Sequence, residues 1–184
     1  MNASQSRTAV SIMLALSILL AGCAAGVKRA EDAEKRRAYF AGGGKLASEV
    51  TISMSKQAQA QVPDNAGFDQ KRLLVAVQRQ LRAKGLLANA PDAELPTIEI
   101  VITDIRVRTS FSAIMFGVMA GDDHITGDVI ARDKSGRELQ RFQVSASYAL
   151  GGVAGRHETR MGWLYGKFAE QTVNELTGQS SGQQ

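Results

Sequence analysis

Residues 97–109, TIEIVITDIRVRT, are the most strand-like stretch of the sequence, because β-branched residues are enriched in strands. Isoleucine recurs with a period of two over the first half, which places these isoleucines on one face of a strand. The alternation changes phase at Thr103-Asp104, and this change predicts a β-bulge. The apolar residues before and after the change are Ile98, Ile100, Ile102, Ile105 and Val107.

Three further segments have strand patterns. Residues 50–54 alternate apolar and polar side chains, and residues 125–132 and 138–148 are joined by the turn residues 133–136. Glycine at position 136 suits the positive backbone φ angle that a tight turn needs. We therefore expect a hairpin late in the chain and one more strand before residue 97.

Two segments have the apolar period of a helix. The first begins after Asp69, a good N-cap, and ends at Lys84-Gly85, where glycine suits the left-handed C′ position. The second runs over residues 158–176, and residues 57–67 read as a polar loop. The expected apolar stripes are Leu73, Leu74, Val77 and Leu81 in the first helix, and Met161, Leu164, Phe168, Thr172 and Leu176 in the second.

The order strand, helix, three strands, helix predicts an α+β fold. The chain has 184 residues, of which 44% are hydrophobic and 22% charged, and these values suit one globular domain. We expect a two-layer sandwich in which a mostly antiparallel sheet of about four strands carries two amphipathic helices on one face. The domain should cover residues 46–177, and the polar residues 178–184 should form a disordered tail.

Residues 1–22 read as a secretory signal peptide. Arg7 precedes an apolar run over residues 9–20, and small residues follow the run, which is the order of such a signal. The run is shorter than the roughly 20 apolar residues that a membrane-spanning helix needs. A buried core helix would carry a polar face, which this run lacks.

The end of the signal, Leu20-Ala21-Gly22-Cys23, resembles the lipobox of bacterial lipoproteins. The resemblance implies cleavage after Gly22 and attachment of acyl chains, palmitate among them, to Cys23. Two or more such chains anchor a protein stably to a membrane. Cys23 is also the only cysteine, so the chain can form no intramolecular disulfide. The alternative is an incidental thiol in a leader that is cleaved elsewhere.

Ala24 occupies the position after the lipobox cysteine. This resembles lipoproteins that are sorted to the outer membrane, because an inner-membrane retention signal has aspartate there. The resemblance implies a lipid-anchored protein of the bacterial cell envelope that faces the periplasm from the inner leaflet of the outer membrane. The inner membrane stays open, since the sorting rule varies between bacteria.

Residues 23–45 read as a lipidated tether. Residues 30–38 contain good helix formers, and the glycines at 42–44 break any helix. Five cations in this segment either touch anionic lipid or simply face solvent. They are Lys28, Arg29, Lys35, Arg36 and Arg37.

From Ile98 onward, several short features recur in a known pattern. They are a strand that ends in Thr103-Asp104, an apolar glycine-containing segment at 116–121, a turn with Asp133 and Gly136, the pair Gly151-Gly152 and a closing amphipathic helix. The pattern resembles an uncharacterised bacterial lipoprotein family, domain of unknown function 4410. Residues 122–124 depart from it, because Asp-Asp-His stands where small residues are usual. The resemblance supplies no catalytic residue.

The sequence contains no evident catalytic or metal site. Asp122-Asp123-His124 joins two carboxylates and an imidazole, but adjacent strand residues point to opposite faces, whereas metal ligands must converge. His157-Glu158 lacks the second histidine of a zinc protease, because Met161 stands in its place. We therefore expect no enzyme activity, no metal and no cofactor. A hydrolase with an unrecognised site is a further alternative.

Residues 111–120 are apolar where a polar connection between strands is expected. The segment is too short to span a bilayer. It could be a loop folded over the core, a contact surface for a protein, or a loop that binds lipid or dips into the bilayer. The candidate interaction residues are Phe111, Ile114, Met115, Phe116, Val118 and Met119.

Together these patterns predict a non-enzymatic envelope lipoprotein that acts as an interaction or docking module. Its partners would be the membrane, through lipid on Cys23, and an unidentified envelope protein or lipid. The formal net charge of +4 is spread along the chain and aromatic residues make up 5%, so nucleic acid is not an expected partner. The alternative is a carrier or sensor of an apolar ligand, such as a lipid, held between the sheet and the helices.

Overall fold

A computed structural model describes residues 23–29, 39–42, 46–116, 119, 121–149 and 156–179. In this part of the chain, five strands form one open sheet in the order β1-β5-β4-β3-β2. Neighbouring strands are antiparallel except for the parallel pair β2–β3. The strands are β1 (Cys23–Arg29), β2 (Val50–Met54), β3 (Thr97–Arg106), β4 (Asp123–Arg132) and β5 (Glu138–Tyr148).

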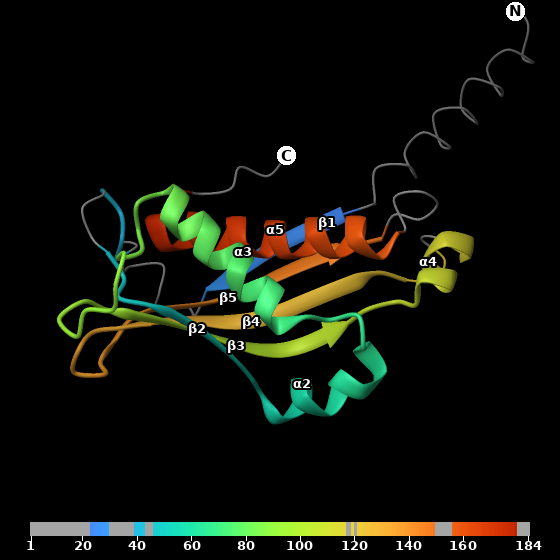
Figure 1. The fold of residues 1–184 in the computed structure, drawn as a ribbon, viewed down its shortest axis with the longest axis horizontal. Coiled ribbons are helices and arrows are strands. Elements are labelled where there is room, and N and C mark those ends of the chain that lie inside the picture. Colours follow the sequence, from blue (N-terminus) through green and yellow to red (C-terminus); the bar gives the residue numbers. More distant parts are fainter. Residues whose placement is uncertain are drawn as a thin grey trace, which may run out of the picture.

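The helices of the described residues differ in length and position. Helices α3 and α5 are long and cover one face of the sheet (Figure 1), which makes the fold α+β as the sequence predicts. Helix α2 lies beside β3, and α4 projects at one end of the sheet (Figure 1). The helices are α2 (Lys56–Gln61), the 3₁₀ turn η3 (Val62–Asn65), α3 (Gln70–Ala83), α4 (Ser110–Phe116) and α5 (His157–Thr177).

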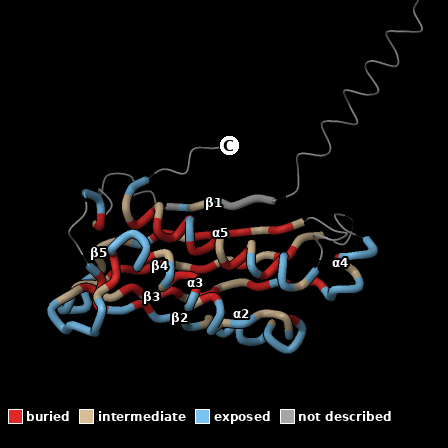
Figure 2. Tube along the Cα trace, turned by 45° about the horizontal axis from the view of Figure 1, so that its top comes forward, coloured by how far each residue is buried: buried red, intermediate tan, exposed pale blue. Residues whose placement is uncertain are grey.

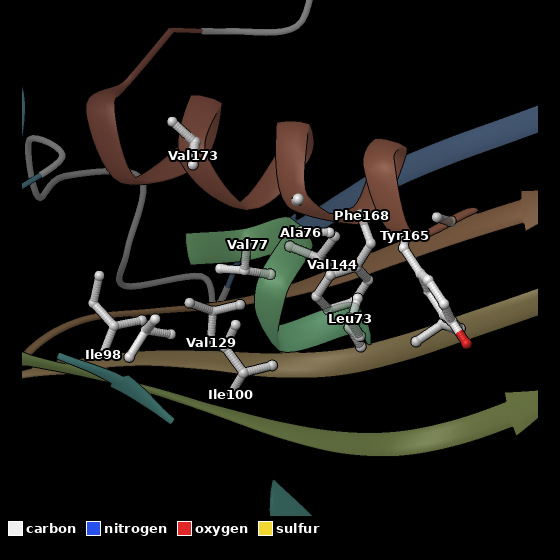
Figure 3. Close-up of a cluster of buried hydrophobic side chains, with 14 of the residues drawn as sticks. Leu73, Ala76, Val77, Ile98, Ile100, Val129, Val144, Tyr165, Phe168 and Val173 are labelled. Atoms are coloured by element: carbon white, nitrogen blue, oxygen red, sulfur yellow. The ribbon is translucent and has the colours of Figure 1, made fainter. Parts of the chain in front are cut away.

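The core lies between the sheet and the pair α3 and α5 (Figure 3). Phe168 of α5 and Leu73 of α3 are fully buried against the sheet. The predicted stripe of α5 is confirmed, whereas in α3 Leu74 is only partly buried and Ala76 is buried instead. Other core residues are Val77, Leu81, Ile98, Ile100, Val129, Val144, Met161, Leu164 and Val173.

The bulge predicted in β3 is confirmed. Ile102 pairs with Gly127 and Asp104 pairs with Thr126, so β3 has one more residue than β4 between these two pairs. The extra residue returns Ile105 to the helix-covered face, where it is buried. The change of phase in the sequence therefore marks one continuous apolar face.

Gly127 allows α5 to approach β4 closely. A Cβ atom at this position would lie 3.3 Å from Cζ of Phe168 and 3.2 Å from the backbone oxygen of Val101. These distances are shorter than the 3.5–4.0 Å or so of ordinary carbon contacts. The ring of Phe168 therefore packs where any other residue would place its side chain.

Both ends of α3 follow the sequence prediction. The carboxylate of Asp69 accepts a hydrogen bond of 3.0 Å from the N–H of Arg72. At the C-terminal end, Gly85 has a φ of +64°, and the N–H of Leu86 donates to the carbonyl of Leu81 at 2.9 Å. This is the Schellman arrangement that glycine at C′ favours.

The segment predicted to be a loop at residues 57–67 is largely helical. It lies beyond the end of β2, where β3 pairs with β4 on one side but has no strand on the other. The side-chain oxygen of Gln61 accepts the N–H of Ile105 at 3.1 Å, and that of Asn65 accepts the N–H of Val107 at 2.5 Å. These polar residues thus satisfy backbone groups that burial would otherwise leave unpaired.

Strand β1 begins within the segment expected to be a tether. It pairs antiparallel with β5 at the edge of the sheet, from Cys23 opposite Tyr148 to Arg29 opposite Phe142. The first four residues of this strand show no strand alternation, so the sequence gives little sign of it. Backbone hydrogen bonds to the edge of β5 hold the strand, and such bonds do not depend on the side chains. The sheet thereby gains a fifth strand.

Several predictions fall on residues outside the described part of the chain. These are the signal peptide at 1–22, the helical segment at 30–38 and most of the tail at 178–184. Within the described residues, no helix combines the length and the apolar character needed to cross a membrane.

Candidate functional site

The features singled out in the sequence meet at one end of the sheet, which we call the Cys23 end. Cys23 at the start of β1 is opposite Tyr148 at the end of β5, and Tyr148 is opposite Asp123 at the start of β4. Strand β3 ends here as well, and α4 follows it after three connecting residues. Figure 1 shows α4 at this end, beyond the strands.

Helix α4 projects away from the core. Thr109 begins it by accepting the N–H of Ser112 on its hydroxyl at 3.1 Å and the N–H of Ala113 on its carbonyl at 3.0 Å. Ala113 is its one buried residue. Helical periodicity places Phe111 and Met115 on the opposite side of α4 from Ala113.

Most of the large apolar side chains exposed in the described structure belong to this segment. Their exposed fractions run from 43% for Ile114 to 93% for Met119. The three others, Leu46, Val62 and Val75, lie on separate elements. Figure 2 shows α4 as a largely exposed element at the end of the sheet. The exposed residues of the segment are Phe111, Ile114, Met115, Phe116 and Met119.

The five large apolar side chains of this segment that the structure describes are therefore exposed, whereas Ala113 is buried. Phe111 and Phe116 contact each other edge to face, with ring centroids 6.2 Å apart. Val118 lies outside the described residues. We call the five exposed residues the α4 patch.

A buried carboxylate, Asp123, lies at the base of this end. Arg160 Nη1 donates to both Asp123 oxygens, at 2.6 and 2.8 Å. Arg108 donates to Asp123 through Nη2 at 3.0 Å and through its backbone N–H at 2.6 Å. All three residues are buried. The cluster joins β4 and α5 to the residues that connect β3 with α4.

The cluster carries one more positive than negative charge. A buried ion is tolerated only when it is paired and hydrogen-bonded. Here backbone carbonyl oxygens accept some of the hydrogen bonds that the two arginines donate. Arg108 donates to the carbonyls of Gly121 at 2.7 Å and Tyr148 at 2.9 Å, and Arg160 donates to the carbonyl of Arg108 at 3.0 Å. Nε of Arg160 is buried without a hydrogen-bond partner among the described residues. The cluster therefore braces the strand ends from which α4 projects.

Neither arginine is among the functional residues predicted from the sequence. Arg160 lies four residues before Leu164 and eight before Phe168, so it occupies the buried stripe of α5. A cation on an apolar stripe indicates a buried counter-charge, and Asp123 supplies it. Arg108 follows Val107 beyond the end of β3, where no apolar periodicity indicates that a charged residue is buried.

The three residues Asp122, Asp123 and His124 separate as their spacing predicts. Asp123 points toward the helices, whereas Nε2 of His124 lies 2.8 Å from the carboxylate of Asp104 and Nδ1 lies 3.6 Å from that of Asp122. Among the described residues, no three His, Cys, Asp or Glu side chains are grouped to hold a metal ion.

Asp104, Asp122 and His124 form a group on the other face of the sheet, and the carboxylate of Asp104 is hydrogen-bonded to two side chains. Burial raises its pKa, but hydrogen bonds from the side chains of Gln61 and His124 outweigh that effect and hold the pKa below its ordinary value. Gln61 Nε2 donates at 2.6 Å. The arrangement is a charged surface network beside the bulge, and it stabilises the end of β3 when Asp104 is ionised.

Two hollows of the described surface lie away from the core. One, of about 530 Å³, is lined by residues 66–72 and His157, and the other, of about 570 Å³, lies at the opposite end of the sheet beside residues 91–97. The space between sheet and helices, where a carried ligand would sit, is filled by buried side chains (Figure 3).

Solved structures with similar folds include bacterial lipoproteins. The PelC dodecamer from Paraburkholderia phytofirmans is 14% identical, with a TM-score of 0.42 over 79% of this chain and 98% of that one. The minor lipoprotein from Acinetobacter baumannii is 12% identical, with a TM-score of 0.38 over 72% and 94%. Rare lipoprotein B from Shewanella oneidensis is 13% identical, with a TM-score of 0.36 over 72% and 94%. At such identities the likeness concerns the fold alone.

A search of curated proteins gives no significant match. The model of one family, described as domain of unknown function DUF4410, matches residues 40–152. The match begins well before Ile98, where the resemblance in sequence pattern starts, and it ends before α5. It covers β2, α3, the hairpin and the whole segment that carries α4. Since more than half of the sequence is matched, the chain belongs to the DUF4410 family.

Proposed function

We propose that this protein is a lipid-anchored component of the bacterial cell envelope that acts through an interaction surface and catalyses no reaction. The α4 patch carries the proposal, because it gathers five exposed apolar side chains, four of them on α4 itself. Monomeric soluble proteins rarely leave such groups exposed together unless they contact a protein or a membrane. Phenylalanine and methionine also suit an adaptable contact surface.

The position of the patch supports this function. A contact surface needs a fixed orientation, and the buried Asp123 cluster holds the strands on either side of α4. The residues that pair around Asp123 come from the β3–α4 connection and from α5. The cluster therefore connects the residues that precede α4 with the core of the domain.

Attachment to a membrane rests on the lipobox-like residues 20–23 and on Cys23 as the lipid acceptor. The Cys23→Ala variant should lose acylation and leave the membrane fraction, because the domain would keep no covalent lipid. Cell fractionation followed by immunoblotting measures this. Membrane-bound Cys23→Ala protein that is still cleaved after Gly22 would contradict the proposal.

The contact surface is tested by a photo-reactive amino acid at position 116 in living cells, with adducts identified by mass spectrometry. Adducts with a discrete protein or with lipid support an interaction surface. Adducts confined to the same chain contradict it, because they would mean that the patch packs on its own domain.

A charge substitution supplies the second test. Phe116→Asp should abolish adducts formed from a photo-reactive residue at position 111. It should change the free energy of unfolding by no more than about 0.5 kcal/mol, because Phe116 is exposed. The matched control is Val75→Asp on α3, which is also exposed and lies outside the patch. Equal loss of adducts in both variants would contradict a specific role for α4.

A further inference from the structure

We propose that the α4 patch contacts the lipid bilayer to which Cys23 is anchored, so that the protein is attached to the membrane at two points. This inference rests on the proposed acylation of Cys23 and names the partner of the α4 patch. The bilayer is favoured over a protein partner by the position of the anchor.

Strand pairing places the anchor and α4 at the same end of the sheet. Cys23, Tyr148 and Asp123 form a row across β1, β5 and β4. The next pair in the sheet, Arg106 with His124, joins that row to β3. Neighbouring strands lie about 4.8 Å apart, so the end of β3 lies roughly 15 Å from Cys23 across the sheet, and α4 begins shortly after it.

The anchor leaves little freedom between the lipid and the domain. Cys23 is itself the first residue of β1 and pairs with β5, so no linker separates the acylated residue from the sheet. A lipid on Cys23 would therefore hold the Cys23 end of the domain at the bilayer surface. The exposed apolar side chains at that same end then face the membrane interface.

The chemistry of α4 suits this interface. Residues 110–116 are Ser-Phe-Ser-Ala-Ile-Met-Phe, with no charged side chain. Phe111, Ile114 and Met115 follow helical spacing on the side away from Ala113. A helix of this length cannot span a bilayer, but its apolar face can lie within the boundary between headgroups and acyl chains.

Two-point attachment would fix the orientation of the domain. The strands would stand with the Cys23 end toward the membrane, and the turn between β4 and β5 would point away from it. That turn carries Asp133, Lys134 and Arg137 in exposed ion pairs. Lys28 lies several residues along β1 from Cys23, on the side that would point away from the bilayer, so it would not be the main lipid contact.

The test uses the full chain purified from membranes and placed in vesicles of phosphatidylethanolamine and phosphatidylglycerol. An environment-sensitive fluorophore is attached to a new cysteine in Met115→Cys, and in Ser135→Cys as the control at the opposite end. Both sites are exposed, so the fold should tolerate the substitutions. Brominated acyl chains quench the fluorophore from the bilayer, and iodide quenches it from water.

We expect brominated lipid to quench position 115 several-fold more than position 135, and iodide to show the reverse order. Strong iodide quenching at both positions would overturn the proposal, because α4 would then be in water. Protection of position 115 from both quenchers would also overturn it, since a protein or a second copy would cover the patch. Phe111→Cys, labelled in the same way, should repeat the result for Met115→Cys.

The same preparation separates this inference from the proposed anchor. In the wild-type chain the only thiol is that of Cys23, and acylation blocks it. Labelling of the wild-type chain would show a free thiol and would contradict the proposed function itself. An unlabelled, vesicle-bound wild-type chain with position 115 in water would contradict only the membrane contact of α4.

Discussion

At the scale of single residues, the cluster of Asp123 with Arg108 and Arg160 is the unusual feature of this domain. Two buried cations share one carboxylate, which is the counter-charge of both. Removing one member of a buried ion pair costs more than replacing the pair with apolar groups. The three residues should therefore respond unequally to substitution.

Asp123→Asn should lower the free energy of unfolding by about 3–5 kcal/mol, because it leaves two buried guanidinium groups without a counter-charge. Arg160→Met should cost less, because the remaining pair of Arg108 and Asp123 is neutral. Urea unfolding followed by circular dichroism measures both. Asp122→Asn, at the half-buried neighbouring position, is the control. A larger loss for Arg160→Met than for Asp123→Asn would contradict this charge balance.

At the scale of elements, α2 and η3 lie beside the second half of β3, where they take the place of a longer β2. Gln61 both accepts the N–H of Ile105 and donates to the carboxylate of Asp104. Asp104 has a pKa below its ordinary value. Its ionised form therefore stabilises the fold above the pKa of the unfolded chain, and this stabilisation is lost as pH falls through the folded pKa.

Gln61→Ala should raise the pKa of Asp104 toward its ordinary value, because one of the two side-chain hydrogen bonds that lower it is lost. Acid unfolding should then begin at a higher pH. Nuclear magnetic resonance titration of the Asp104 carboxyl carbon measures the pKa directly. Gln59→Ala is the matched control, because Gln59 lies on the same helix and donates to the carbonyl of Met54 instead. An unchanged pKa of Asp104 in Gln61→Ala would contradict the role of the Gln61 hydrogen bond in lowering that pKa.

An element could be predicted from the sequence when burial of an apolar face stabilises it. The bulged strand β3, the hairpin and helices α3 and α5 bury periodic apolar faces, so their patterns are visible in the sequence. Strand β1 and helix α2 are held by backbone or amide hydrogen bonds, which leave no apolar period. The α4 segment was recognised as apolar, but its exposure depends on the short connections around it. Arg160 could have been identified from the sequence, because a charged residue on the apolar stripe of α5 indicates a buried partner of opposite charge.

At the scale of the whole molecule, β1 closes one edge of the sheet and carries the expected anchor. Without it, β5 would present unpaired backbone groups, which favour pairing with another chain. Val27 of β1 also packs against the core. The strand therefore has a structural role that an N-terminal tether would not have.

A chain that starts at Tyr39 should be less stable than one that starts at position 23 with Cys23→Ser. The difference should reach about 2 kcal/mol or more, because several backbone hydrogen bonds worth roughly 0.5–1.5 kcal/mol each are lost. The shorter chain should also self-associate. Urea unfolding and sedimentation velocity measure the two effects. Equal stability and a monomeric shorter chain would mean that β1 is dispensable.

Lipid attachment at Cys23 is the claim on which the membrane function depends, and intact-protein mass spectrometry of the natural product from bacterial membranes tests it most directly. We expect a mature chain whose first residue is Cys23 and whose mass exceeds that of the polypeptide by attached acyl chains. A chain that begins elsewhere, or an unmodified Cys23, would contradict the claim.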